Sequence, residues 1–272
     1  MTRIAVQARG ARLSARVDGE PGRPWLLLSN SLAADLSMWD DQVPLLTRTH
    51  RLVRYDTRGH GASEAPEGAY DFATLVEDMV AVLDAVGAAQ ADVIGLSLGG
   101  MTALGLGLAY PGRVRRLVVC DARADAPPPF VQGWEDRIGA VRSKGTEALV
   151  EGTLARWFTP RAANEPVARA AAMIRSTPTS GYIGCARALQ GLDYLADLPG
   201  MTVPVLYLVG EEDQGAPLAA MRAMAEATPG GRLIILPGLA HIPNMEDPAA
   251  FAQALEGWLA ETPAKTSAGA AA

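Results

Sequence analysis

Short apolar runs alternate with longer amphipathic stretches along most of this 272-residue chain. The apolar runs are PWLLLSN, RLVRYD, ADVIGLS, RRLVVCD, VPVLYLVG and RLIILPG, and several of them are apolar throughout. Strands that are apolar on both faces are typical of a parallel sheet covered by helices on each side. Amphipathic segments at residues 71–86, 101–110, 217–227 and 248–259 separate these runs. The pattern therefore predicts an α/β fold with a mostly parallel sheet and right-handed crossovers.

Two stretches depart from this alternation. Between Arg3 and Val17, two segments of alternating apolar and polar residues meet at Gly10, which predicts a hairpin. From residue 124 to 198 there is no strand pattern, and the segment opens with APPPF, which cannot continue a sheet. We expect a helical lid here, because insertions this long between core strands are usually functional. The alternative is a structural helical bulge with no role at the site.

These patterns predict one α/β domain built from two parts of the chain. Residues 1–123 and 199–261 are expected to form the core, and residues 124–198 the lid between them. The last segment, 262–272, is rich in small residues and is expected to be a disordered tail.

Composition narrows the classes of partner. The formal charge of −6 argues against nucleic-acid and anionic-membrane surfaces, since both would repel the protein. No apolar run is long enough to span a bilayer, and the first residues lack a signal-peptide core. Cys120 and Cys185 lie far apart without metal-type spacing, so we expect buried thiols, no metal site and a reducing cytoplasmic location. The oligomeric state stays open, a homo-oligomer included.

The stretch VIGLSLGGM carries the clearest chemical signal. Gly95, Ser97 and Gly99 match the G-x-S-x-G nucleophile elbow, which places a serine on a tight strand-to-helix turn. The match is informative because an apolar strand pattern precedes it and a helical pattern follows it. A serine hydroxyl is a weak nucleophile, so the hypothesis requires a base and an acid elsewhere in the chain.

Three histidines compete for the role of base. His50 precedes the RLVRYD run, at the amino edge of the sheet, and is expected to be a surface residue. His60 lies in the loop TRGHGAS, upstream of the serine. His241 follows the last predicted strand, so Ser97 and His241 match the serine, acid, histidine order of the α/β hydrolases. We therefore predict that His241 is the base, and that Arg58 and His60 brace their loop.

The acid should follow a strand that lies between Ser97 and His241 in the chain. Asp213 follows VPVLYLVG and is the preferred candidate, while Asp121 and Asp125 after RRLVVC are its competitors. Glu211 and Glu212 are expected to be solvated turn residues.

An oxyanion hole needs two N–H donors beside the nucleophile. Leu98, the residue after the serine, supplies the first. The loop LLLSNSLAADLSMWD places Asn30-Ser31 where many hydrolases carry His-Gly, so Leu32 is expected to donate the second. The alternative is that Asn30 only caps a turn.

At these residues the chain resembles the 3-oxoadipate enol-lactonases. The widely shared segments are RYDTRGHGAS and GLSLGG, and the more particular ones are SNSL, WEDRI, RWFTP and GYIGC. Departures are Ala33-Ala34, where that family usually has Gly-Thr, and Ile242-Pro243, where Leu-Ser is common. The resemblance implies the α/β-hydrolase fold, with an eight-stranded, mostly parallel sheet, helices on both faces and a helical lid after the sixth strand.

The resemblance also implies a cytoplasmic hydrolase of aromatic catabolism that opens an enol-lactone to 3-oxoadipate without a cofactor. Such a small-molecule substrate carries a carboxylate, which requires a cation or N–H donors. The predicted lid offers Arg137, Arg142, Lys144, Arg156 and Arg161. Trp134 and Arg137 lie one helical turn apart, so both could face the cleft, although an aromatic lid anchor and a solvated arginine explain the spacing equally well.

Two further hypotheses about function use the same residues. A carboxylesterase or haloperoxidase-like perhydrolase would use the triad on small esters or other lactones, and its lid would lack a carboxylate-binding cation. A catalytically inactive hydrolase serving as a receptor would not need Ser97, Asp213 and His241 intact.

Overall fold

The computed structural model describes residues 2–261, so the tail expected at 262–272 lies outside the described residues. Within them the chain forms one eight-stranded sheet in the order β1-β2-β4-β3-β5-β6-β7-β8. The strands are β1 (Thr2–Ala8), β2 (Ala11–Asp18), β3 (Trp25–Ser29), β4 (Arg51–Tyr55), β5 (Ala91–Leu96), β6 (Val114–Cys120), β7 (Val205–Gly210) and β8 (Arg232–Leu236). Strands β3 to β8 pair in parallel, and β2 pairs antiparallel with β1 and β4. The predicted mostly parallel sheet and the N-terminal hairpin are therefore confirmed.

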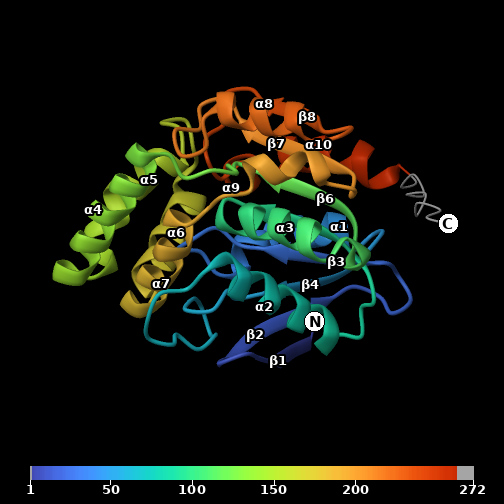
Figure 1. The fold of residues 1–272 in the computed structure, drawn as a ribbon, viewed down its shortest axis with the longest axis horizontal. Helices are drawn as coiled ribbons and strands as arrows, with labels where there is room; N and C mark the ends of the chain where they lie inside the picture. The colour runs from blue at the N-terminus through green and yellow to red at the C-terminus, as the bar shows by residue number, and fades with distance from the viewer. Residues whose placement is uncertain (1, 262–272) are drawn as a thin grey trace.

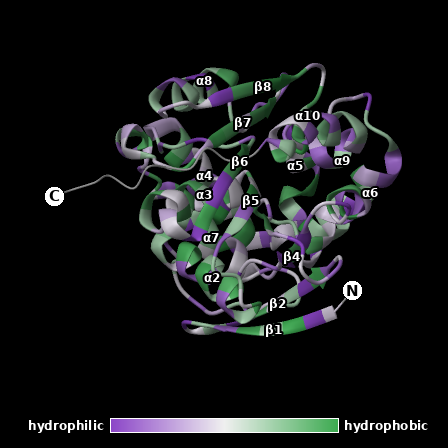
Figure 2. Ribbon diagram, turned by 90° about the vertical axis from the view of Figure 1, so that its right-hand side faces the viewer, coloured by the Kyte–Doolittle hydropathy of each residue, from purple (hydrophilic) through white to green (hydrophobic). Residues whose placement is uncertain are grey.

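Helices lie on both faces of this sheet (Figure 2). One side carries α2 (Phe72–Ala85), α3 (Leu98–Ala109) and α8 (Leu218–Ala227), and the other carries α9 (Pro243–Glu246) and α10 (Pro248–Ala260). Helix α1 (Val43–Leu46) contacts the same 3-10 turn, Leu36–Gln42, as α9 and α10. Short 3-10 turns occupy Leu36–Gln42, Pro111–Arg113, Thr146–Leu149 and Leu195–Gly200. Every residue of β5 and β7 is buried, because helices cover both faces of these central strands. This double burial explains why their sequences are apolar throughout.

The segment between β6 and β7 is helical. It forms α4 (Pro128–Lys144), α5 (Val150–Trp157), α6 (Asn164–Ser176) and α7 (Thr179–Gln190), which gather to one side of the sheet in Figure 1. An isolated bridge between Asp125 and Asp193 joins the two ends of this insertion, which otherwise contains no strand among its described residues. Helix α7 packs tightly on the loop after β4, since a Cβ built on Gly181 would lie 2.0 Å from the carbonyl oxygen of Gly59.

The structure corrects one expectation, that His50 is a surface residue. Its side chain is buried, and its Nε2 lies 2.9 Å from Oδ2 of Asp92 at the amino end of β5. Arg115 and Arg116 of β6 pair with the same carboxylate. A buried aspartate must be paired, and here the partners come from two segments, the residue before β4 and the adjacent arginines of β6, both distant from Asp92 in sequence. His50 lies at the amino edge of the sheet, as predicted, but that position does not determine whether its side chain is buried.

The described residues contain no helix both long and apolar enough to cross a membrane. Cys120 and Cys185 are free and buried, as expected. Burial raises the pKa of both thiols, which keeps them protonated and unreactive.

Candidate active site

The predicted nucleophile lies on a strained turn between β5 and α3. Ser97 has a left-handed φ of 54°, which is costly for a residue with a side chain and is typical of functional turns. The flanking glycines are sterically required: a Cβ on Gly95 would lie 2.2 Å from the carbonyl oxygen of Gly99, and one on Gly99 would lie 2.3 Å from that of Ser29. The turn presents the Ser97 side chain, partly exposed, at the carboxyl edge of the sheet.

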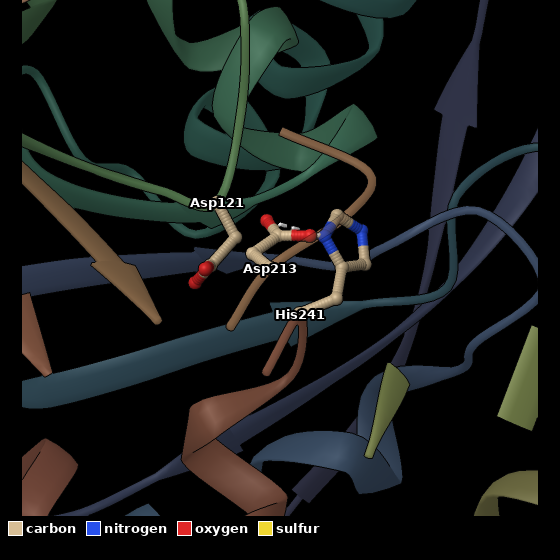
Figure 3. Close-up of side chains that lie close together, drawn as sticks. All are labelled: Asp121, Asp213 and His241. Carbon is tan, nitrogen blue, oxygen red and sulfur yellow. Dashed lines mark hydrogen bonds and ion pairs between the residues drawn. The ribbon is translucent and has the colours of Figure 1, made fainter. Parts of the chain in front are cut away.

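The predicted base and acid contact each other. The Nδ1–H of His241 donates a hydrogen bond of 2.8 Å to Oδ2 of Asp213, and both side chains are buried (Figure 3). The other oxygen of Asp213 accepts the N–H of Gly215 at 2.6 Å. These contacts hold the imidazole in one orientation, with Nε2 on the side of the ring away from the carboxylate.

Ser97 and His241 line the same pocket, which has a volume of about 310 Å³. No hydrogen bond joins the two side chains among the described residues. Catalytic hydrogen bonds are often long or poorly aligned without substrate, so a shared pocket is the relevant geometric condition for this pair.

The backbone around the pocket offers donors where an oxyanion would form. Leu98 is the first residue of α3, so its N–H has no partner within the helix. In the loop after β3, the N–H of Ser31 bonds to Sδ of Met38 and that of Ala34 to the Ser31 carbonyl. The N–H of Leu32, which lines the pocket, has no acceptor among the described residues.

His60 supports this loop from outside the pocket. Its Nε2 accepts the N–H of Ala33 at 2.9 Å, and its Nδ1–H donates to the carbonyl of Arg58 at 3.1 Å. Burial lowers the pKa of His60 to about 4, so it is neutral and can accept and donate at once. Arg58 pairs with Asp78 of α2 at 2.6 Å. His60 therefore ties its own loop to the loop after β3, and Arg58 ties that same loop to α2.

Asn30 does more than cap a turn. Its amide donates to the Tyr55 carbonyl at 2.7 Å, and its Oδ1 accepts from Nε1 of Trp39 at 2.9 Å. Its carbonyl also accepts the N–H of Gly99 at 3.0 Å. Asn30 thus ties the loop that contains Leu32 to the nucleophile turn.

Residues of the insertion line the same pocket as Ser97. Trp134 of α4 packs edge-on against Phe130 and tilts toward Tyr182 of α7. The guanidinium of Arg137 lies 4.5 Å from the centre of the Trp134 ring. All four line the pocket, so Trp134 and Arg137 share one face of α4.

Residues 24–248 match the profile of the α/β hydrolase fold. The chain is also 32% identical over 252 residues to 3-oxoadipate enol-lactonase 2 of Acinetobacter baylyi, which spans 92% of this chain and 93% of that protein. This chain belongs to the α/β-hydrolase family. It is similar to the crystal structure of the enol-lactonase from Burkholderia xenovorans, with a TM-score of 0.89 and 36% identity over 95% of this chain and all of that one. A putative carbamate hydrolase of Stutzerimonas stutzeri is 29% identical over 89% of this chain and 94% of its own length.

The candidate cations of this α/β hydrolase separate into two groups. Arg137 and Arg156 line the pocket, are half-buried and have no acidic partner among the described residues. Burial and then the charge of Arg137 lower the pKa of Arg156. Arg142 and Lys144 are exposed, and Arg161 pairs with Glu212 at 2.6 Å. Two cations therefore share the pocket without a counter-charge.

Arg156 is one of the five cations that the sequence offers in the lid, without a signal that distinguishes it, and Arg123, which also lines the pocket, is not among them. Arg156 comes from α5, so no helical periodicity relates it to Arg137. Arg123 is already paired with Asp125 at 2.9 Å, on the loop after β6.

The two competing acids occupy different environments. Asp125 is partly exposed and engaged with Arg123. Asp121 is fully buried, and one ligand-type atom from each of Asp121, Asp213 and His241 lies within 4.8 Å of the others. This cluster could geometrically hold a metal ion, but the Nδ1 of His241, both oxygens of Asp213 and one oxygen of Asp121 already make internal hydrogen bonds. The cluster is better described as a hydrogen-bonded network around the histidine.

Proposed function

We propose that this α/β hydrolase is a serine hydrolase that opens the lactone ring of 3-oxoadipate enol-lactone to give 3-oxoadipate, with Ser97, His241 and Asp213 as its triad. The observation that carries the proposal is one pocket lined by the elbow serine, the histidine of a His–Asp pair and two arginines without acidic partners among the described residues. The names of the enol-lactonase relatives support the same reaction.

In the first half of the reaction, Oγ of Ser97 attacks the lactone carbonyl while Nε2 of His241 takes its proton. Asp213 keeps the Nδ1–H tautomer and stabilises the imidazolium. The N–H groups of Leu32 and Leu98 donate to the oxyanion, each contributing about 3–4 kcal/mol to the transition state.

In the second half, the bond to the ring oxygen breaks and His241 returns the proton to it. The leaving oxygen is an enol that stays attached to the acyl chain and tautomerises to the ketone. His241 then deprotonates a water, which attacks the acyl-enzyme, and returns that proton to Oγ of Ser97 as the acid is released.

The substrate carboxylate accounts for the two arginines. Arg137 is held against Trp134, and Arg156 approaches it from a second helix. Their mutual repulsion is relieved when an anion binds between them, and charge-assisted hydrogen bonds to guanidinium are strong and directional. We assign the insertion at 124–198 the role of a lid that supplies these groups.

The test compares kcat/KM on 3-oxoadipate enol-lactone, on its carboxylate methyl ester and on p-nitrophenyl acetate, for wild type and Ser97→Ala. We expect strong preference for the free-acid lactone and loss of all three activities in the variant. Activity that survives Ser97→Ala would overturn the mechanism.

Comparable turnover of p-nitrophenyl acetate would retain the triad but favour the carboxylesterase or perhydrolase alternative. A small carbamate belongs in the same series, because one relative is named as a putative carbamate hydrolase. Equal rates on the free acid and its methyl ester would overturn the role of the arginines.

A further inference from the structure

Asp121 is a buried acid beside the His–Asp pair that the proposed mechanism does not use. It follows β6 directly and has a left-handed φ of 46°, which aspartate tolerates better than most residues. Its Oδ1 accepts the N–H of Gly210 at 2.8 Å, while its Oδ2 is buried without a hydrogen-bond partner. It lies next to Asp213, with His241 on the far side of that residue (Figure 3).

The surroundings of Asp121 disfavour a second negative charge. No cationic side chain pairs with it among the described residues. The titratable groups that face it are Asp213 after β7, His241 after β8 and the buried thiol of Cys120 on its own strand. Two adjacent carboxylates in a buried site do not both ionise, and Asp213 is the one that bonds to the imidazole.

We propose that Asp121 is a positioning residue that remains protonated and donates an O–H hydrogen bond from its Oδ2 to Asp213. The interaction satisfies the unpartnered oxygen and completes a chain from Asp121 through Asp213 to His241. Burial, the charge of Asp213 and a side-chain hydrogen bond with Asp213 raise the pKa of Asp121 well above its ordinary value, in agreement with this assignment.

A donated hydrogen bond disperses the charge on Asp213. The imidazolium of His241 formed during the reaction is then less stabilised than it would be beside an isolated carboxylate, so the pH profile of the reaction is expected to depend on Asp121. The proposal rests on the proposed triad but not on the identity of the lactone.

The kinetic test uses pH profiles of kcat/KM for p-nitrophenyl acetate, which report on the triad independently of the natural substrate. Asparagine at position 121 can accept from Gly210 and donate to Asp213, so Asp121→Asn should stay within about threefold of wild type with the same acid limb. Asp121→Ala should lose about 10- to 100-fold, and its acid limb should move to higher pH. Asp125→Asn, on the same loop, is the matched control and should change neither.

Ser97→Ala and Asp213→Asn in the same assay separate the two proposals. If Ser97→Ala stays active, the proposed function fails. If Asp121→Asn loses as much as Asp213→Asn while Ser97→Ala is inactive, Asp121 acts as an ionised acid and this inference fails alone. Equal losses in Asp121→Asn and Asp121→Ala with an unchanged acid limb would reduce Asp121 to packing and also overturn it.

Unfolding in urea between pH 5 and 8 provides a second measurement for folded variants. A carboxyl whose folded pKa lies above its unfolded pKa contributes stability at low pH that is lost as pH rises. Asparagine does not titrate, so wild type should lose stability relative to Asp121→Asn as pH rises, with a slope approaching one proton. A constant difference across this range would show that Asp121 is ionised throughout and would overturn the proposal.

Discussion

Two buried histidine–aspartate pairs lie at opposite edges of the sheet. His50 contacts Asp92 through Nε2 at 2.9 Å at the amino edge, and His241 contacts Asp213 through Nδ1 at 2.8 Å at the carboxyl edge. The other nitrogen of His50 bonds to the hydroxyl of Thr49 at 2.8 Å. The Nε2 of His241 has no partner among the described residues, and the ring lines a pocket.

The aspartates also differ in how their charge is balanced. Arg115 and Arg116 both pair with Asp92, whereas no arginine pairs with Asp213 among the described residues. Burial raises the pKa of Asp92, but hydrogen bonds from His50 and the two arginines outweigh it and lower the pKa overall. A short His–Asp hydrogen bond therefore does not by itself indicate catalysis. A ring nitrogen without a partner, a pocket and a carboxylate without an arginine partner among the described residues distinguish the pair that we propose to be catalytic.

Replacing each of the two histidines should give the largest difference in kcat between the two pairs. His241→Ala removes the proposed base, and we expect kcat to fall by about 10⁴- to 10⁶-fold. His50→Ala should leave kcat of the folded enzyme unchanged, because His50 is far from the pocket. Kinetics with p-nitrophenyl acetate, checked by circular dichroism, measure both. Similar losses of kcat in two well-folded variants would contradict the assignment.

Replacing the two aspartates should affect stability in the opposite order, with the larger loss in the free energy of unfolding at Asp92. Asp92→Asn leaves two arginines without their carboxylate, and we expect a loss of about 3–5 kcal/mol in the free energy of unfolding. Asp213→Asn should cost less, since no arginine depends on it among the described residues. Urea denaturation at pH 7 compares them, and a larger cost for Asp213→Asn would refute this ranking.

His60 shows how a buried histidine behaves without a carboxylate. Its pKa falls to about 4 because of burial, so its stability contribution is complete above the unfolded pKa and is lost as pH falls toward 4. The loss should reach about 3 kcal/mol between pH 6.5 and 4. His60→Gln does not titrate, so its deficit relative to wild type should shrink as pH falls. Parallel unfolding curves for the two proteins would rule this out.

Replacing one of the two pocket arginines, Arg137 and Arg156, should give the smallest effect, a change in kcat/KM for the carboxylate-bearing lactone. Arg156→Gln should lower kcat/KM for the carboxylate-bearing lactone by about tenfold, because one charge-assisted hydrogen bond is lost at a partly exposed site. Turnover of p-nitrophenyl acetate should not change. Arg142→Gln, on the exposed face of α4, is the matched control. An equal loss in both variants would indicate a general effect of net charge.

The sheet and the nucleophile turn could be predicted from sequence because their signals are local. The apolar runs identify the strands, and Gly95 and Gly99 identify a turn in which no Cβ fits. Ser97, Asp213 and His241 each follow a predicted strand. Parallel topology brings the carboxyl ends of these strands to one edge of the sheet, so the three residues are expected to lie near one another.

What could not be predicted depends on contacts between distant segments. His50 is buried because Asp92 lies opposite it, 42 positions along the chain. Arg156 lines the pocket from α5, a different helix from the one that carries Arg137, so no helical periodicity relates the two residues. The environment of Asp121 depends on Gly210, which is 89 positions away.

The contact between Gly59 and Gly181 restricts the amino-acid sequence of α7, whereas the pocket-facing positions of α4 and α5 are free to vary. Any side chain at either glycine would collide with the opposing backbone, so a single substitution separates α7 from the loop that carries His60. The residues that face the pocket from α4 and α5 have no such constraint. On the proposed function, substrate range can therefore drift through Trp134, Arg137 and Arg156 over generations, while Gly59 and Gly181 hold the loop that carries His60 in place.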